Sequence, residues 1–161
     1  VYYTIIRQKT ARLIASCCAV GASSAGADEA LTERMRLFGE KVGMAFQIKD
    51  DLFDYGEDEI GKPLGIDIKE KKMTLPLIYA LNNAAWLDKK RIIYLVRNKN
   101  EDKKAGQEGI SFGKKSGGLE YAQKVMNQYV AEAKELLTGF PASAYKSSLE
   151  DLVKFTIERK K

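Results

Sequence analysis

The sequence predicts an all-α fold, a helix bundle that forms a single domain over residues 1–161. Apolar residues recur at intervals of three and four positions, which is the period of an α-helix and not of a strand. The one stretch that resembles a strand, RIIYLVR at 91–97, follows LDKK directly and lacks alternating polarity. With 161 residues, of which 45% are hydrophobic and 30% charged, the chain is long enough to bury one core.

In the first half of the chain, this period predicts helices over about Tyr3–Val20, Asp28–Tyr55 and Leu75–Asn82. The helical pattern begins within a few residues of Val1, and no capping residue precedes it. Because Val1 is also not a methionine, we expect the chain to begin inside a longer protein.

In the second half, we expect helices over about Asp88–Asn98, 119–137 and 149–157. One apolar face indicates the 119–137 helix, and it consists of Ala122, Val125, Met126, Tyr129, Val130, Ala133, Leu136 and Leu137. The last helix is indicated by Leu149, Leu152, Val153, Phe155 and Ile157. Five of the 13 glycines fall within residues 106–118, which predicts a loop between helices.

Composition and charge exclude several classes of protein. The formal charge is +5, but acidic residues are interleaved with the basic ones, so a nucleic-acid partner is not predicted. Cys17 and Cys18 are adjacent and cannot form an ordinary bridge, which favours small apolar roles in a reducing, cytoplasmic setting. No apolar run approaches the roughly 20 residues of a transmembrane segment, so we expect a soluble protein.

The stretch FQIKDDLFD at 46–54 carries the chemistry, because it places three carboxylates within five positions of an apolar run. On a helix with Asp50 at zero, Gly43 lies at about 20°, Asp54 at about 40°, Gln47 at about 60° and Asp51 at about 100°. Such anions repel one another and are costly unless a cation or water stabilises them. A solvated acidic patch at a helix end is the simpler alternative.

A calcium loop does not fit this motif. Aligning Gly56 with the sixth position of an EF-hand puts Lys62 at the twelfth, where a glutamate is required. Oxygen ligands on one helix face, too few to enclose an ion, suit Mg²⁺, which completes its shell with water and phosphate oxygens. The predicted partner is therefore a phosphate or diphosphate.

Lysines at two other places support a diphosphate ligand. Lys9 and Thr10 lie on the first predicted helix, and Lys62 and Lys72 follow the acidic helix after a turn. A diphosphate bound through Mg²⁺ on one side needs ammonium groups and hydroxyl donors on the other. Each lysine taken alone is more simply explained as a surface residue.

These motifs resemble a known family. KTA at 9–11, FQIKDDLFD at 46–54 and GKPLGIDIKEKKMTLPLIYAL at 61–81 are similar to the C-terminal half of trans-isoprenyl diphosphate synthases, the polyprenyl synthetase family. The resemblance implies the class I isoprenoid synthase fold. It also implies a Mg²⁺-dependent prenyltransferase that ionises an allylic diphosphate, joins it to isopentenyl diphosphate and releases a proton, in a homodimer.

The resemblance assigns roles position by position. Asp50 would be the principal metal ligand, and Asp51 and Asp54 would bind the metal directly or through its waters. The allylic diphosphate would be held by Lys9, Thr10, Gln47 and Lys72. Lys62 would be a further lysine on the diphosphate side, and Phe46 would lie near the isopentenyl pocket. We expect catalysis to depend mainly on Lys9, Thr10, Asp50 and Lys72.

The chain departs from the family in one respect. The first aspartate-rich motif and the upstream positions for isopentenyl diphosphate have no counterpart in this sequence. We therefore expect half of an active site, with a missing N-terminal half as partner and no activity alone. Two alternatives remain, a class I terpene cyclase and a non-catalytic partner subunit of a synthase.

Overall fold

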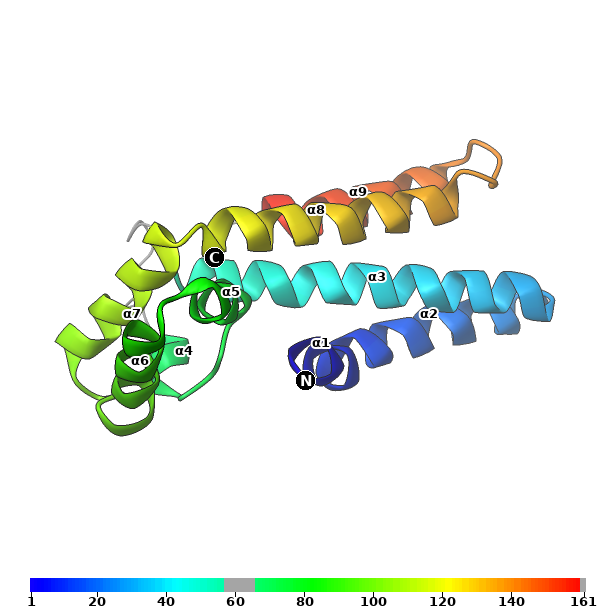
Figure 1. Ribbon diagram of the computed structural model, residues 1–161. Helices are drawn as coiled ribbons and strands as arrows, with labels where there is room; N and C mark the ends of the chain where they lie inside the picture. The colour runs from blue at the N-terminus through cyan, green and yellow to red at the C-terminus, as the bar shows by residue number, and fades with distance from the viewer. Residues whose placement is uncertain (57–65, 160–161) are drawn as a thin grey trace. The chain divides into compact units, whose positions relative to one another are not determined.

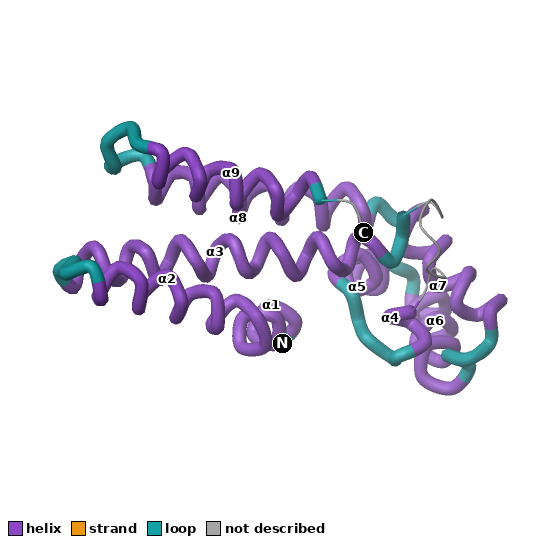
Figure 2. The backbone as a smooth tube through the Cα atoms, turned by 180° about the vertical axis from the view of Figure 1, so that it is seen from behind, coloured by secondary structure: helices purple, strands orange, loops and turns teal. Residues whose placement is uncertain are grey.

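The computed structural model describes residues 1–56 and 66–159, and every regular element in these ranges is a helix (Figures 1 and 2). The elements are α1 (Tyr2–Ile6), the π-helix η1 (Arg7–Ala11), α2 (Arg12–Ser24), α3 (Glu29–Phe53), α4 (Ile66–Lys69), α5 (Leu75–Asn83), α6 (Trp86–Asn98), α7 (Lys103–Lys115), α8 (Gly118–Leu137) and α9 (Ala144–Glu158). The all-α prediction is confirmed. Within the described ranges, no helix combines the length and the apolar character that crossing a membrane requires.

Helix starts follow the local sequence. Asp28 accepts the Leu31 N–H at 2.8 Å before α3, and Asp102 accepts the Lys104 N–H at 2.8 Å before α7. These carboxylates satisfy amides that have no partner inside the helix. α5 begins with Pro76 in its first turn, where a missing N–H costs nothing.

The chain divides into two compact units. The long-helix unit comprises residues 1–49 and 125–159, and the short-helix unit comprises residues 50–56 and 66–124. In the long-helix unit α2 runs back alongside α3, and α8 and α9 lie side by side (Figures 1 and 2). The expectation of a single domain stays a prediction.

Two glycines of α3 allow the first helices of the long-helix unit to approach closely. A Cβ at Gly43 would lie 2.5 Å from Ala11 Cα, and a Cβ at Gly39 would lie 2.7 Å from the Ile14 carbonyl oxygen. No side chain fits at such distances. Gly43 shares a helix face with the acidic motif, and the neighbour for which its missing side chain makes room is η1.

The other side of α3 is joined to α8 by charged side chains. Lys41 Nζ lies 2.6 Å from a Glu132 carboxylate oxygen, and it also lies 5.4 Å from the centre of the Tyr129 ring. Arg34 donates from Nε to the Leu136 carbonyl oxygen at 2.6 Å. This bond satisfies a carbonyl at the end of α8 that has no helical partner.

The buried residues of α8 agree with its predicted apolar face, whereas those of α9 do not. Of the predicted α8 face, the buried members are Ala122, Met126, Val130, Ala133 and Leu137. On α9, Val153 is buried, but Leu152 is 46% and Phe155 63% exposed. These two side chains lie about 100° and 160° from Val153 around the helix. The predicted apolar face of the last helix was therefore too wide.

The short-helix unit has an apolar core, and one sequence-based prediction within it was wrong. Its core consists of Tyr55, Ile68, Leu77, Leu81, Ile92, Val96 and Ile110. The predicted loop over residues 106–118 was wrong, because most of it lies in α7. A Cβ at Gly109 would lie 2.8 Å from Ile68 Cδ1, and one at Gly113 would lie 2.8 Å from Tyr55 Cε1. These glycines serve close packing of a helix, not a turn.

Candidate functional site

The three aspartates of the acidic motif lie at the C-terminal end of α3. Asp50 and Asp51 are half-buried in the last turn, and Asp54, just past the helix end, is 3% exposed. Negative charge is unfavourable at this end of a helix, where the peptide dipoles already concentrate partial negative charge. Because Asp54 is buried, the motif is not simply a solvated surface patch.

Two of these carboxylates accept amide protons from the segment that follows in the sequence. Asp51 Oδ2 accepts the Leu75 N–H at 2.8 Å, at the first residue of α5. Asp54 Oδ2 accepts the Asp67 N–H at 3.3 Å, in α4. These bonds partly offset the cost of the buried charge. They also fix the segment that carries Lys72 against the end of α3.

A buried tyrosine and threonine make the third link between the same segments. The Tyr55 hydroxyl lies 2.6 Å from Thr74 Oγ1, and both side chains are buried. Burial raises the pKa of the Tyr55 phenol, and nearby Asp54 and Asp51 raise it further. No role for Tyr55 was predicted from the sequence, although an aromatic residue directly after the last aspartate of an acidic motif was an available signal.

Lys72 lies at the surface of this segment, among acidic residues. Its Nζ is paired with a Glu70 carboxylate oxygen and lies 3.5 Å from Asp67 Oδ1. The hydrogen bond that its ammonium donates to the Glu70 carboxylate raises the pKa of Lys72, so the ammonium is charged at neutral pH. Exposed ion pairs contribute only about 0–1 kcal/mol, so a more highly charged anion can displace these carboxylates.

Lys9 and Thr10 belong to the long-helix unit and lie in η1. The side chain of Lys9 is exposed and that of Thr10 is half-buried, while Ala11 is fully buried. A π-helical turn inserts an extra residue into the hydrogen-bond ladder and occurs frequently at functional sites. The sequence predicted a regular helix here, because one inserted residue leaves little trace in the apolar period.

Phe46 and Gln47 are half-buried on α3 in the same unit. The Arg159 guanidinium lies 3.8 Å from the centre of the Phe46 ring, and its Nη2 donates to the Phe46 carbonyl oxygen at 3.2 Å. Arg159 follows the last residue of α9. The basic end of the described chain therefore contacts a predicted substrate-binding residue, and sequence reasoning did not predict this contact.

The predicted site residues fall into three groups. Those of the long-helix unit are Lys9, Thr10, Phe46 and Gln47, and those of the short-helix unit are Asp50, Asp51, Asp54 and Lys72. Lys62 lies outside the described residues.

The carboxylates suit a hard divalent cation by their chemistry. All three supply oxygen ligands. An ionised carboxylate has about four acceptor sites, so one hydrogen bond from a backbone amide leaves sites for a metal. Among residues 1–56 and 66–159, no three acidic, histidine or cysteine side chains converge closely enough to hold one ion. The donor type therefore fits a metal, although these side chains do not form a coordination shell in this structure.

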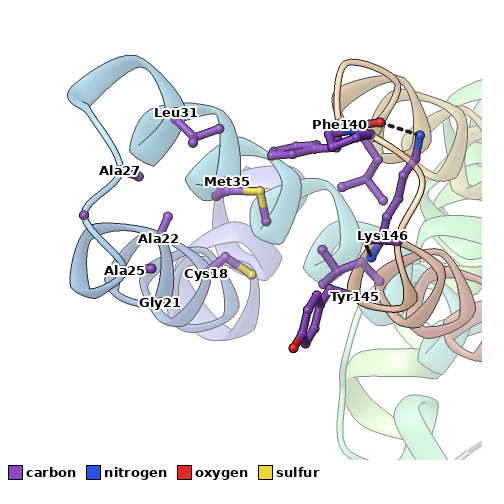
Figure 3. Close-up of a pocket in the computed structure, with 15 residues that line it drawn as sticks. Cys18, Gly21, Ala22, Ala25, Ala27, Leu31, Met35, Phe140, Tyr145 and Lys146 are labelled. Carbon is purple, nitrogen blue, oxygen red and sulfur yellow. Dashed lines mark hydrogen bonds between the residues drawn. The ribbon is translucent and has the colours of Figure 1, made fainter.

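An apolar pocket of about 640 Å³ lies in the long-helix unit, between the α2–α3 turn and the α8–α9 turn (Figure 3). Cys18, Met35 and Leu31 line one side of it and Phe140 the other. Lys146 Nζ donates to the Phe140 carbonyl oxygen at 3.1 Å. Its size and apolar lining are typical of sites that bind small apolar ligands.

Known proteins resemble both the sequence and the structure. The sequence model of the polyprenyl synthetase family matches residues 1–111. Heptaprenyl diphosphate synthase component 2 of Bacillus subtilis (strain 168) is 35% identical over 161 residues, a match that covers 99% of this chain and 45% of that protein.

Solved structures give the same picture. Geranylgeranyl pyrophosphate synthase from Bacteroides thetaiotaomicron matches with a TM-score of 0.91 and 37% identity, over 98% of this chain and 52% of that chain. Polyprenyl synthase from Caulobacter crescentus CB15, complexed with calcium and isoprenyl diphosphate, matches with a TM-score of 0.86 and 33% identity, over 98% of this chain and 49% of that chain. The chain thus spans about half the length of the relatives it matches.

Proposed function

The chain belongs to the polyprenyl synthetase family and has the all-α class I isoprenoid synthase fold. We propose that it is the C-terminal half of a prenyltransferase. The reaction joins an allylic diphosphate to isopentenyl diphosphate and lengthens the isoprenoid chain. One observation carries the proposal. The acidic end of α3 is bonded, through Asp51 and Asp54, to the segment that contains Lys72.

In this proposal Asp50, Asp51 and Asp54 hold Mg²⁺, with Asp50 as the principal ligand. Bound Mg²⁺ would neutralise the negative charge that develops on the diphosphate oxygens as the carbon–oxygen bond breaks. The hydrogen bonds that Asp51 and Asp54 accept from backbone amides support this role, because they orient both carboxylates before any ligand binds.

Lys9, Thr10, Gln47 and Lys72 would bind the allylic diphosphate, and Lys62 would add a further positive charge. An ammonium or hydroxyl that donates to a diphosphate oxygen stabilises the leaving group more as its charge grows. The exposed Lys9 and the exchangeable ion pairs of Lys72 leave both ammonium groups able to reach an anion. Phe46 would border the isopentenyl diphosphate.

The apolar pocket of the long-helix unit supports an isoprenoid ligand, because it offers few polar groups and a volume within the usual range for small-molecule sites. The proposal also includes a homodimer and a reducing cytoplasmic setting. In support of the latter, Cys17 and Cys18 are both free thiols. Sedimentation equilibrium tests the dimer.

The direct test is calorimetric titration of the 161-residue chain with inorganic diphosphate, with and without Mg²⁺. We expect binding that requires Mg²⁺ and that Asp50→Asn weakens by tenfold or more. Asp151→Asn, an exposed aspartate on α9, is the matched control and should bind as the parent chain does. Equal binding by both variants would contradict the proposal and favour a non-catalytic partner subunit.

A prenyl-transfer assay tests the remaining expectation, that these 161 residues are inactive alone. Turnover of about 1 per second or faster would be a normal enzyme rate and would overturn it.

A further inference from the structure

The outer face of α6 carries large apolar side chains exposed to solvent. Trp86 is 64% exposed, Leu87 72% and Tyr94 55%. The opposite face carries Ile92 and Val96, which are buried in the core of the short-helix unit. The exposure therefore does not arise from a loosely packed helix.

Basic side chains share this outer face. Taking Trp86 as zero, Arg97 lies at about 20°, Lys90 at about 40°, Tyr94 at about 80° and Leu87 at about 100° around the helix. Lys90 Nζ lies 3.9 Å from the centre of the Trp86 ring. We call these five residues the aromatic–basic face.

Negative charge on α6 lies away from the aromatic–basic face. Asp88 lies at about 200°, on the far side from Lys90. Glu108 of α7 is paired with Arg91, 2.8 Å between Oε1 and Nη2. The aromatic–basic face thus presents positive charge together with apolar and amphipathic side chains.

We propose that the aromatic–basic face of α6 docks on an anionic lipid surface. Trp and Tyr prefer the boundary between lipid headgroups and acyl chains, and long basic side chains reach anionic headgroups from the same depth. Each such basic residue strengthens binding to an anionic membrane about fivefold. Tryptophan, tyrosine and arginine are also enriched at protein interfaces, but lysine is depleted there, and Lys90 lies in the middle of this face. The proposal stands apart from the prenyltransferase reaction.

Trp86 is the only tryptophan of the chain, so its fluorescence reports directly on this surface. We expect vesicles of phosphatidylglycerol and phosphatidylcholine to shift its emission to shorter wavelength and to protect it from acrylamide. Pure phosphatidylcholine vesicles should have no effect. Salt at about 1 M should abolish the change, because the Debye length falls to about 3 Å.

Vesicle flotation with variants identifies the residues responsible. The double variant Lys90→Gln, Arg97→Gln should partition about 30-fold more weakly, which corresponds to two basic contacts. Trp86→Ser should also float poorly. The control, Lys134→Gln with Lys154→Gln, removes two exposed lysines from α8 and α9 and should float like the parent chain. Circular dichroism checks that each variant is folded.

Three results would overturn the proposal. They are an unchanged Trp86 spectrum in phosphatidylglycerol vesicles, equal flotation of the Lys90/Arg97 variant and the lysine control, and a spectral shift caused by polyglutamate but not by vesicles. The last result would point to an acidic protein partner instead.

Discussion

The Tyr55 hydroxyl and Thr74 Oγ1 lie 2.6 Å apart and are buried, so the Thr74 side chain bonds the tyrosine and not the start of the helix that follows it. Thr74 precedes α5 in the capping position, yet its side chain makes no cap bond. The first amide of α5, at Leu75, is instead accepted by Asp51. The acidic motif therefore caps a helix that begins 24 residues later, and the threonine is left to bind the tyrosine.

We expect Tyr55→Phe to lower the free energy of unfolding by about 1–3 kcal/mol, because the Thr74 hydroxyl stays buried without its partner. Urea unfolding followed by circular dichroism measures the change. The matched control is Tyr145→Phe, at a tyrosine that is 85% exposed, and it should change stability by less than about 0.5 kcal/mol. A Tyr55→Phe chain as stable as the parent would show that the bond contributes nothing.

The same tyrosine should make stability depend on pH in the alkaline range. Its pKa in the folded chain is raised, chiefly by burial, whereas a tyrosine in the unfolded chain titrates near about 10. Above that pH the unfolded chain releases a proton that the folded chain retains, so stability must fall as pH rises.

We therefore expect the free-energy difference between the parent chain and Tyr55→Phe to be constant from about pH 7 to 9 and to shrink above about pH 10. Urea unfolding of both proteins across this range measures it. Lysines and other groups that titrate in the same range affect both proteins alike and cancel in the comparison. A difference that stays constant above about pH 10 would mean that the Tyr55 pKa is not raised, and one that widens would mean that it is lowered.

Two substitutions at Asp51 should separate its structural role from its proposed role in metal binding. Asp51→Ala removes the acceptor of the Leu75 N–H and should cost about 0.5–2 kcal/mol, as the loss of a helix cap does. Asp51→Asn keeps a carbonyl oxygen for that amide and should retain most of the stability. Both should weaken Mg²⁺-dependent diphosphate binding in calorimetry. If the alanine variant is as stable as the asparagine variant, the cap is energetically silent.

The sequence was sufficient for the features that depend on local pattern. The periods of three and four residues predicted helices α3 and α8 and the buried face of α8, because helix formation and burial act on the same side chains. The position of Asp50 and Asp51 on α3 followed from the same period. The amide partners of Asp51 and Asp54 did not, because they depend on the path of the chain between α3 and α5.

The glycine-rich segment at 106–118 shows where local pattern misleads. Glycine weakens an isolated helix, so five glycines in a short stretch favour a loop when only propensity is considered. In the structure Gly113 contacts the Tyr55 ring, and Gly118 lies against the Pro76 carbonyl oxygen. The stability gained when the backbone packs closely against a neighbour outweighs the helix propensity that glycine lacks. Propensities of single residues do not include such contacts, so the sequence could not predict them.

Two alanine substitutions in α7 should therefore change the free energy of unfolding in opposite directions. A Cβ at Gly113 would lie 2.8 Å from Tyr55 Cε1, and the hydrogen bond to Thr74 keeps the ring from moving away, so Gly113→Ala should destabilise by about 1–3 kcal/mol. A Cβ at Gly106 would have no neighbour within 4 Å among the described residues beyond its own stretch of helix, so Gly106→Ala should stabilise by about 0.5–1 kcal/mol through propensity alone.

Urea unfolding of the two variants measures both effects, and each serves as the control for the other, because the chemical change and the helix are the same. If both variants are stabilised, the Tyr55 ring has room to move and the close approach of α7 does not hold it. If Gly106→Ala destabilises, α7 resists a better helix former at an open position, and the segment is not a stable helix in solution. Only a loss of stability for Gly113→Ala together with a gain for Gly106→Ala agrees with a close approach at Gly113 that excludes a side chain.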